Sequence, residues 1–183
     1  MLQGIENMKF VMIFGPSGIG KETIARQLAS QKDWRVFPQH LAFDIASAVI
    51  GFGNDGFEKY QRDICLNALK TLHSNKVTGV VFTFCYVSKA SDYFIQGLLS
   101  LLDEMQVVGE FFRINCELEE HIARVTSNGR KNTNKIQTEE YLRHYLQRFD
   151  FGESIPNARS YALDTTSMTP EESANAIAAK LRT

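Results

Sequence analysis

The sequence predicts an α/β fold: a doubly wound, five-stranded parallel sheet with helices on both faces and a small lid. Short apolar runs alternate with helical patterns along the whole chain, which is typical of a parallel sheet with crossover helices. The first run, KFVMIF (9–14), lacks polar alternation, as is typical of a strand buried on both faces. A glycine-rich turn follows it at once and opens a helix. These observations together favour the α/β class.

The other elements follow in order. After the turn, ETIARQLASQ places Ile24, Ala25 and Leu28 on one stripe, which predicts an amphipathic helix. A last helix is expected from Pro170, because Thr169 and Glu172 suit a capping box. Four further strands are expected at WRVF (34–37), GVVFTFCYV (79–87), VVGEFFRIN (107–115) and ARSYALD (158–164). Further helices are expected near 41–50, 57–73, 91–104, 118–127 and 138–149.

Length and composition limit the classes of function. The 183 residues fit one domain, 1–183, without repeats or linkers. Lys and Arg total 20 against 21 acidic residues, so no excess charge favours nucleic acid or an anionic membrane as a partner. The three cysteines, Cys65, Cys85 and Cys116, form neither a metal pair nor a disulfide framework. We expect a cytoplasmic monomer or homodimer, since no signal sequence opens the chain and its longest apolar stretch is about half a membrane span.

The glycine-rich turn carries the strongest motif. Gly15, Gly20 and Lys21 give the pattern GxxxxGK, and the strand before it and the helix after it supply the context of a phosphate-binding loop. Glycines let backbone amides converge on phosphate oxygens, and the helix adds the positive end of its dipole. The alternative is a tight turn with an exposed lysine. The predicted nucleotide-binding residues are Gly15, Pro16, Ser17, Gly18, Ile19, Gly20, Lys21, Glu22 and Thr23.

Glu22 stands where such loops usually carry a hydroxyl that holds magnesium. An acidic residue in the first turn of a helix is stabilised by the dipole, so the favoured interpretation is a solvent-facing helix-start residue. The alternative is that the carboxylate binds Mg²⁺ directly or through water. Thr23 keeps a hydroxyl that can donate to a phosphate oxygen, and is a second candidate metal ligand.

GPSGIGKET (15–23) resembles the loop of the P-loop small-molecule and nucleotide kinases. Adenylate and guanylate kinases similarly have a residue without a hydroxyl after the lysine, followed by Thr. More specifically, the chain resembles bacterial AAA-family ATPase or shikimate kinase-like proteins, whose loop resembles GPPAVGKMT and is followed by HNH-like and GFGSEGF-like segments. Those segments here are FPQHLAFDI (37–45), with Pro38 and Gln39 replacing the first two HNH residues, and GFGNDGF (51–57). The resemblance implies the P-loop fold, with ATP and Mg²⁺ as ligands.

His40 and Asp44 are the predicted substrate-binding residues. They follow the second strand at its carboxyl end, the edge where open α/β sheets bind ligands. If the segment is helical, the pair could orient or deprotonate a substrate hydroxyl. The alternative is a local pair between His40 and Asp44. Residues 38–60 then form a substrate-side flap, in which GFGNDG (51–56) is a turn between helices and no dinucleotide fingerprint.

A lid is predicted over residues 124–137, where a helix breaks at Ser-Asn-Gly before a basic stretch. Arginines brought over the phosphates by a closing lid stabilise the charge of phosphoryl transfer. By resemblance to kinase lids, Arg124 and Arg130 are the candidates and Lys135 is a weaker third. The alternative is a solvated basic loop.

The third strand ends without the acidic residue that usually helps to hold magnesium, so phosphates and water are expected to hold the ion. Asp44 is the best alternative acid, and Asp164 is expected to order a turn or border the base pocket. We therefore expect an ATP-dependent phosphotransferase with Lys21, Arg130, Arg124 and Asp44 as catalytic residues. The acceptor is a small molecule or nucleotide, and the choice between ATP and GTP is open. The alternative is a nucleotide-binding regulator or slow NTPase.

Overall fold

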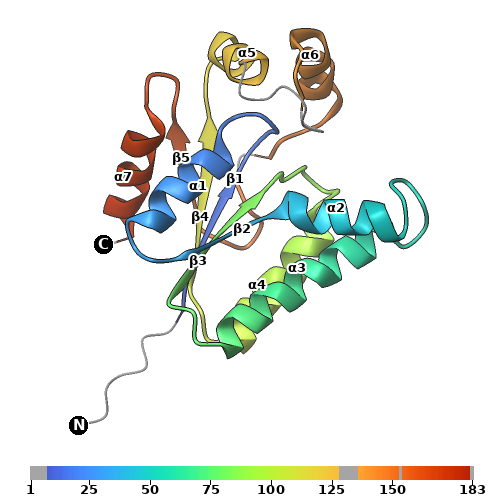
Figure 1. The fold of residues 1–183 in the computed structure, drawn as a ribbon, viewed down its shortest axis with the longest axis vertical. Helices are drawn as coiled ribbons and strands as arrows, with labels where there is room; N and C mark the ends of the chain where they lie inside the picture. The colour runs from blue at the N-terminus through green and yellow to red at the C-terminus, as the bar shows by residue number, and fades with distance from the viewer. Residues whose placement is uncertain (1–7, 128–135, 153, 182–183) are drawn as a thin grey trace.

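The computed structural model of the chain describes residues 8–127, 136–152 and 154–181 (Figure 1). Five strands alternate with helices, as the sequence predicts. The strands are β1 (Lys9–Phe14), β2 (Arg35–Pro38), β3 (Gly79–Phe84), β4 (Gly109–Asn115) and β5 (Ser160–Asp164). The helices are α1 (Lys21–Ser30), α2 (Gln39–Val49), α3 (Phe57–Ser74), α4 (Asp92–Glu104), α5 (Leu118–Thr126), α6 (Glu139–Arg148) and α7 (Pro170–Lys180).

The strands form one parallel sheet in the order β2-β3-β1-β4-β5. The central strand β1 pairs with β3 on one side and β4 on the other, so that Met12 lies opposite Phe82 and Phe111. The strands β2 and β3 lie on one side of β1, with β2 at the edge, and β4 and β5 lie on the other side. This confirms the predicted five-stranded parallel sheet, and the loop after β1 lies at the point where the winding reverses.

Helices cover both faces of the sheet (Figure 1). Alternate residues of a strand point to opposite faces, so β1 contributes to two separate cores. Phe10 and Met12 pack in the core that includes residues of α3 and α4. Val11 and Ile13 pack in the core that includes residues of α1 and α7. The double-sided burial explains why the strands read as continuous apolar runs.

The strand ends differ from the predicted ones where neighbours stop pairing. β3 ends at Phe84, before the end of the predicted run 79–87, because its last pairing on the β1 side is with Phe14. The Val107 amide bonds back to Leu102, closing the end of α4, and β4 therefore begins only at Gly109. The capping box of α7 is confirmed: the Thr169 hydroxyl accepts from the Glu172 amide, and the Glu172 carboxylate accepts from the Thr169 amide.

The GFGNDG segment connects α2 to α3, and the residues Gly51, Gly53 and Gly56 have positive φ values. It is a turn between two helices and not a strand-to-helix fingerprint, as expected. Three aromatic rings hold it against α2: the ring centroids of Phe43, Phe52 and Phe57 lie 5.3 to 5.5 Å apart. Within the described residues, none of the helices has the length and apolarity needed to cross a membrane.

Candidate functional site: a phosphate loop between two walls

The loop between β1 and α1 is built from glycines in left-handed conformations. Gly15, Gly18 and Gly20 have φ values of 144°, 91° and 104°. A Cβ on Gly15 would lie 2.6 Å from the Ile114 carbonyl oxygen of β4, so a side chain is excluded there. Gly20 precedes α1 without a side chain that caps the helix. The loop therefore curls tightly at the positive end of the α1 dipole, as an anion site requires.

Lys21 lies across this loop. Its Nζ atom donates to the Gly15 carbonyl oxygen at 2.9 Å and to the Pro16 carbonyl oxygen at 2.7 Å. These bonds hold the ammonium group at the centre of the curl, in the first turn of α1. The group is a compact cation with three donors, which suits a phosphate oxygen.

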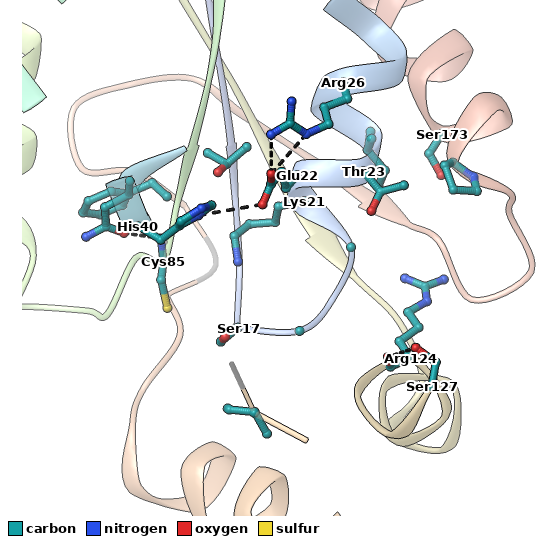
Figure 2. A pocket seen from close by; sticks show the side chains of 18 of the residues that line it. Ser17, Lys21, Glu22, Thr23, Arg26, His40, Cys85, Arg124, Ser127 and Ser173 are labelled. Carbon is teal, nitrogen blue, oxygen red and sulfur yellow. Dashed lines mark hydrogen bonds and ion pairs between the residues drawn. The ribbon is translucent and has the colours of Figure 1, made fainter. Parts of the chain in front are cut away.

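Glu22 lies in the first turn of α1, as the favoured interpretation expects, and its carboxylate also contacts neighbouring side chains. Its side chain is only 25% exposed. The Oε1 atom accepts from Arg26, with distances of 3.0 Å to Nε and 2.6 Å to the terminal nitrogen. The Oε2 atom lies 3.7 Å from Nδ1 of His40, and Figure 2 shows the carboxylate between these two side chains. Thr23 lies on the other side of α1, toward Ser173 (Figure 2).

His40 and Asp44 stand on successive turns of α2 and line the same cavity. The structure brings His40 toward Glu22 of α1, however, and the described part of the chain shows no ion pair between His40 and Asp44. The alternative, a local pair between His40 and Asp44, is therefore not found in that part of the chain, and the substrate-binding role of the two residues stays a prediction. The reason that His40 faces Glu22 is tertiary: α2 starts directly after β2, which lies next to β3 in the sheet, and its first turn faces α1 across the cavity.

Arg124 braces the outside of the loop. Its guanidinium donates to the carbonyl oxygen of Ile19 at 2.7 Å and to both the hydroxyl and carbonyl oxygens of Thr165 at 3.0 and 2.6 Å. A further bond of 2.7 Å goes to Glu120 one turn earlier on α5. All three nitrogens thus have protein acceptors. This side chain joins three segments: α5, the phosphate loop and the turn after β5.

The other predicted lid residues, Arg130 and Lys135, fall in 128–135, outside the described residues. The structure describes only the two ends of the predicted lid, the C-terminal end of α5 and the residues before α6. The catalytic role of Arg130 therefore stays a prediction.

Tyr145 of α6 contacts the loop and was not predicted. Its hydroxyl accepts from the Ser17 amide at 3.3 Å and lies 3.0 Å from the Cys85 sulfur. The Cys85 amide in turn donates to the Gln39 side chain at 3.0 Å. Burial, then the neighbouring Cys85, raises the pKa of the Tyr145 phenol far above its ordinary value, so the group stays neutral.

His121 of α5 was also missed. The side chain is buried, and its Nε2 atom lies 2.9 Å from the Ser17 carbonyl oxygen. No sequence pattern links either residue to the loop, because each is more than 100 positions away from Ser17. The aromatic neighbours of Tyr145, Phe149 and Phe151, are the only local signal, and they indicate packing.

These elements surround a cavity of about 1470 Å³, a larger volume than a single small ligand requires. The loop and Lys21 form its floor. Figure 2 shows His40 and Cys85 on one side of Lys21 and Arg124, Ser127 and Ser173 on the other. We call these sides the α2 wall, lined by Gln39, His40, Phe43, Asp44 and Cys85, and the α7 wall, lined by Ala123, Arg124, Ser127, Met168, Pro170 and Ser173.

Asp164 orders the turn after β5, as one of its two predicted roles requires. Its Oδ1 atom accepts from the Thr166 hydroxyl at 2.6 Å and the Thr166 amide at 2.8 Å. These bonds lower the pKa of the carboxyl group. Among the described residues, no three His, Cys, Asp or Glu side chains are grouped to hold a metal ion.

Comparisons with known proteins identify the fold. No family profile and no curated protein matches the sequence. Among solved structures, a sugar kinase from Janibacter is 16% identical with a TM-score of 0.68, covering 96% of this chain and 95% of its own. A tunicamycin resistance protein from Deinococcus radiodurans is 19% identical with a TM-score of 0.65, covering 95% of both chains. Shikimate kinase from Acinetobacter baumannii is 15% identical with a TM-score of 0.60, covering 98% and 96%.

At these identities the comparison concerns architecture, and the narrower resemblance to shikimate kinase-like ATPases stays a prediction. The matches extend over nearly the whole of each chain. The chain has the fold of the P-loop kinases.

Proposed function

We propose that the protein is an ATP-dependent kinase that transfers the γ-phosphoryl group to a hydroxyl of a small molecule or nucleotide. The observation that carries the proposal is the placement of Lys21 on a curled glycine loop at the floor of a cavity with two walls. One wall serves the nucleotide and the other serves the acceptor. The solved kinases of the same fold support the proposal.

The triphosphate would lie on residues 15–23, with its phosphates at the loop amides and the start of α1. The α7 wall would take the base, because Met168 and Pro170 offer apolar surface there and Ser173 and Ser127 offer hydroxyls. Arg124 would then act as a positioning residue for the loop, since its guanidinium is already bonded to Ile19 and Thr165. We propose ATP as the nucleotide, and thermal stabilisation by GTP, measured beside that by ATP, tests this choice.

Magnesium would neutralise the charge of the phosphates during transfer. The donors available to it are phosphate oxygens and water, with the hydroxyl of Thr23 as a protein contact at the cavity wall. Glu22 fits this role poorly, because its Oε1 atom is engaged by Arg26.

The acceptor would bind at the α2 wall, under the flap of residues 38–60. Its hydroxyl oxygen forms a new bond to the γ-phosphorus as the bond from that phosphorus to the ADP oxygen breaks. Lys21 stabilises the charge on the transferred group, and His40 or Asp44 orients the hydroxyl and takes its proton. Arg130 from the lid of residues 124–137 is proposed as a second cation over the phosphates.

Lys21→Ala tests the proposal. We expect the variant to lose the thermal stabilisation that Mg-ATP gives to the wild type, with an affinity at least ~tenfold lower, or about 1.4 kcal/mol. Without nucleotide, its unfolding should stay close to wild type, because the hydrogen bonds that Lys21 makes to Gly15 and Pro16 lie in a partly buried loop and not in the core. Lys70→Ala, an exposed lysine on α3 that does not line the cavity, is the control. Unchanged ATP binding in Lys21→Ala would refute the site.

A nucleotide-binding regulator or slow NTPase is the second candidate. One observation favours it: β3 ends at Phe84 without an acidic residue, and the described residues hold no metal cluster. The two candidates differ in whether the phosphoryl group is transferred to an acceptor molecule. Incubation with labelled ATP and panels of sugars, polyols, nucleosides and nucleotides should yield a phosphorylated product if the kinase proposal is correct. Binding and slow phosphate release without any such product favour the regulator.

A further inference from the structure

Glu22 is the residue in the loop that the proposed kinase chemistry does not use. Its carboxylate is turned away from the loop carbonyls that hold Lys21 and toward α2. Arg26 contacts only the Oε1 atom, through two nitrogens one helical turn away. The other oxygen, Oε2, is therefore left on the side of His40, at 3.7 Å from Nδ1.

His40 stands at the start of α2, with one edge of its ring toward Glu22. The Nδ1 edge of the ring faces Glu22, and within the described residues no hydrogen bond is found for the Nε2 atom. The side chain is 39% exposed and lines the cavity, so the Nε2 edge is accessible to a ligand. The other charged groups near this pair are Lys21 and Arg26 of α1 and Asp44 of α2.

We propose that Glu22 is a positioning residue for the acceptor: its carboxylate holds His40 in the form with the proton on Nδ1, which leaves Nε2 to accept the proton of the acceptor hydroxyl. This inference rests on the proposed kinase function. It gives Glu22 a role in which its carboxylate does not bind the magnesium ion. The distance of 3.7 Å is longer than a hydrogen bond. Such contacts in ligand-free sites commonly shorten when substrate binds.

The chemistry balances with groups already in the site. The acceptor O–H bond breaks as its oxygen bonds to the γ-phosphorus, and the proton passes to Nε2 while ADP leaves. The imidazolium that forms is stabilised by the Glu22 carboxylate, as an acidic partner stabilises the catalytic histidine in hydrolases. After release of the product, the proton passes to water. A Glu at this position of the loop is then an acceptor-side group, placed one residue from the lysine that holds the phosphate.

The tautomer of His40 tests the positioning role without any acceptor. Nitrogen-15 spectra of the full chain should show His40 with the proton on Nδ1 at a pH where the ring is neutral. In Glu22→Ala the ring should revert toward the Nε2–H form that free histidine prefers, whereas Glu22→Gln should retain part of the effect through its amide oxygen. Glu58→Ala is the matched control, since Glu58 is also an acidic first-turn residue, on α3 and outside the cavity. An unchanged His40 tautomer in Glu22→Ala would overturn the proposal.

Titration with Mg-ATP separates positioning from metal binding. A carboxylate that only positions His40 leaves the affinity for Mg-ATP within about threefold of wild type when Glu22 is replaced by Ala. A loss of tenfold or more, absent when magnesium is omitted, would show that Glu22 binds the ion and would overturn the proposal. If the wild-type protein binds no ATP, the proposed kinase function fails. The tautomer measurement then still tests whether Glu22 positions His40, because it needs no nucleotide.

Discussion

At the scale of single residues, side chains from α5 and α6 form hydrogen bonds to the outer surface of the phosphate loop. Arg124 and His121 reach the carbonyl oxygens of Ile19 and Ser17 from α5, and Tyr145 reaches the Ser17 amide from α6. The loop is thus held from outside while Lys21 spans it from within. A preorganised loop loses less conformational freedom when it binds an anion.

Arg124→Lys is predicted to loosen this arrangement. A lysine keeps the charge but cannot reproduce the forked contacts to Ile19 and Thr165. We expect the free energy of unfolding to fall by about 1.5–3 kcal/mol, the range for a hydrogen bond to a charged group. Urea denaturation measures the loss. Arg143→Lys on α6, an arginine that pairs only with surface glutamates in the described structure, is the control and should change little.

At the scale of elements, α6 is joined to β3 and to the loop by one phenol. The Tyr145 hydroxyl contacts Ser17 and Cys85, and Cys85 is bonded through its amide to Gln39 at the start of α2. Four segments therefore meet at this point: α6, the loop, the end of β3 and α2. Through Tyr145, the position of α6 is coupled to that of the phosphate loop. Because α6 follows the predicted lid in the chain, we expect the lid to be coupled to the loop as well.

Tyr145→Phe is predicted to break this link while it keeps the ring that packs on Phe149 and Phe151. The Ser17 amide loses its acceptor, and an unsatisfied group in a partly buried site costs about 1–3 kcal/mol. Hydrogen exchange of the Ser17 amide should become faster. Tyr141→Phe, an exposed tyrosine on the same helix, controls for the general effect of removing a hydroxyl. Equal protection of Ser17 in the Tyr145 variant and the wild type would contradict the link.

The capping box of α7 gives a prediction on pH. The Thr169 amide, then its hydroxyl, lowers the pKa of Glu172. A carboxyl group with a pKa that is lower in the folded state stabilises the fold above its unfolded pKa, and the contribution is lost as the pH falls through the folded pKa. Melting temperatures of wild type and Glu172→Gln should therefore differ most near neutral pH and converge in the acid range. A difference that is independent of pH would contradict this origin.

The sequence predicts the elements better than it predicts their contacts. The positions of the strands and helices and the capping box follow from local patterns that lie within a few residues of one another. The ends of β3 and β4 do not, because they depend on where neighbouring strands stop pairing. Within the site, the loop itself was predictable, whereas the contacts of Glu22 with His40 and of Tyr145 with Ser17 join residues far apart in the chain.

At the scale of the whole molecule, ligand binding is predicted to raise stability by mass action. If Mg-ATP binds only the folded chain, a concentration of 100 times Kd adds about 2.7 kcal/mol to the free energy of unfolding. Thermal scans at several ATP and GTP concentrations measure this and show which base is preferred. Removal of magnesium by EDTA should weaken the effect, since the phosphates then lose their counter-ion. A melting temperature that does not change with either nucleotide would contradict the proposed function.

The sheet order has a consequence for the evolution of the protein. The α2 wall comes from residues just after β2 and from Cys85 after β3, and the α7 wall comes from α5 and from residues after β5. The loop between them connects β1 to α1. The two walls are thus built from separate stretches of the chain, and the bonds of Gln39 with Cys85 and of Tyr145 with Cys85 and Ser17 connect the α2 wall to the loop. Exchanging residues 41–57 for the corresponding segment of another protein of this architecture is a route to new acceptors that keeps Gln39 and His40, the residues of this segment that contact Cys85 and Glu22.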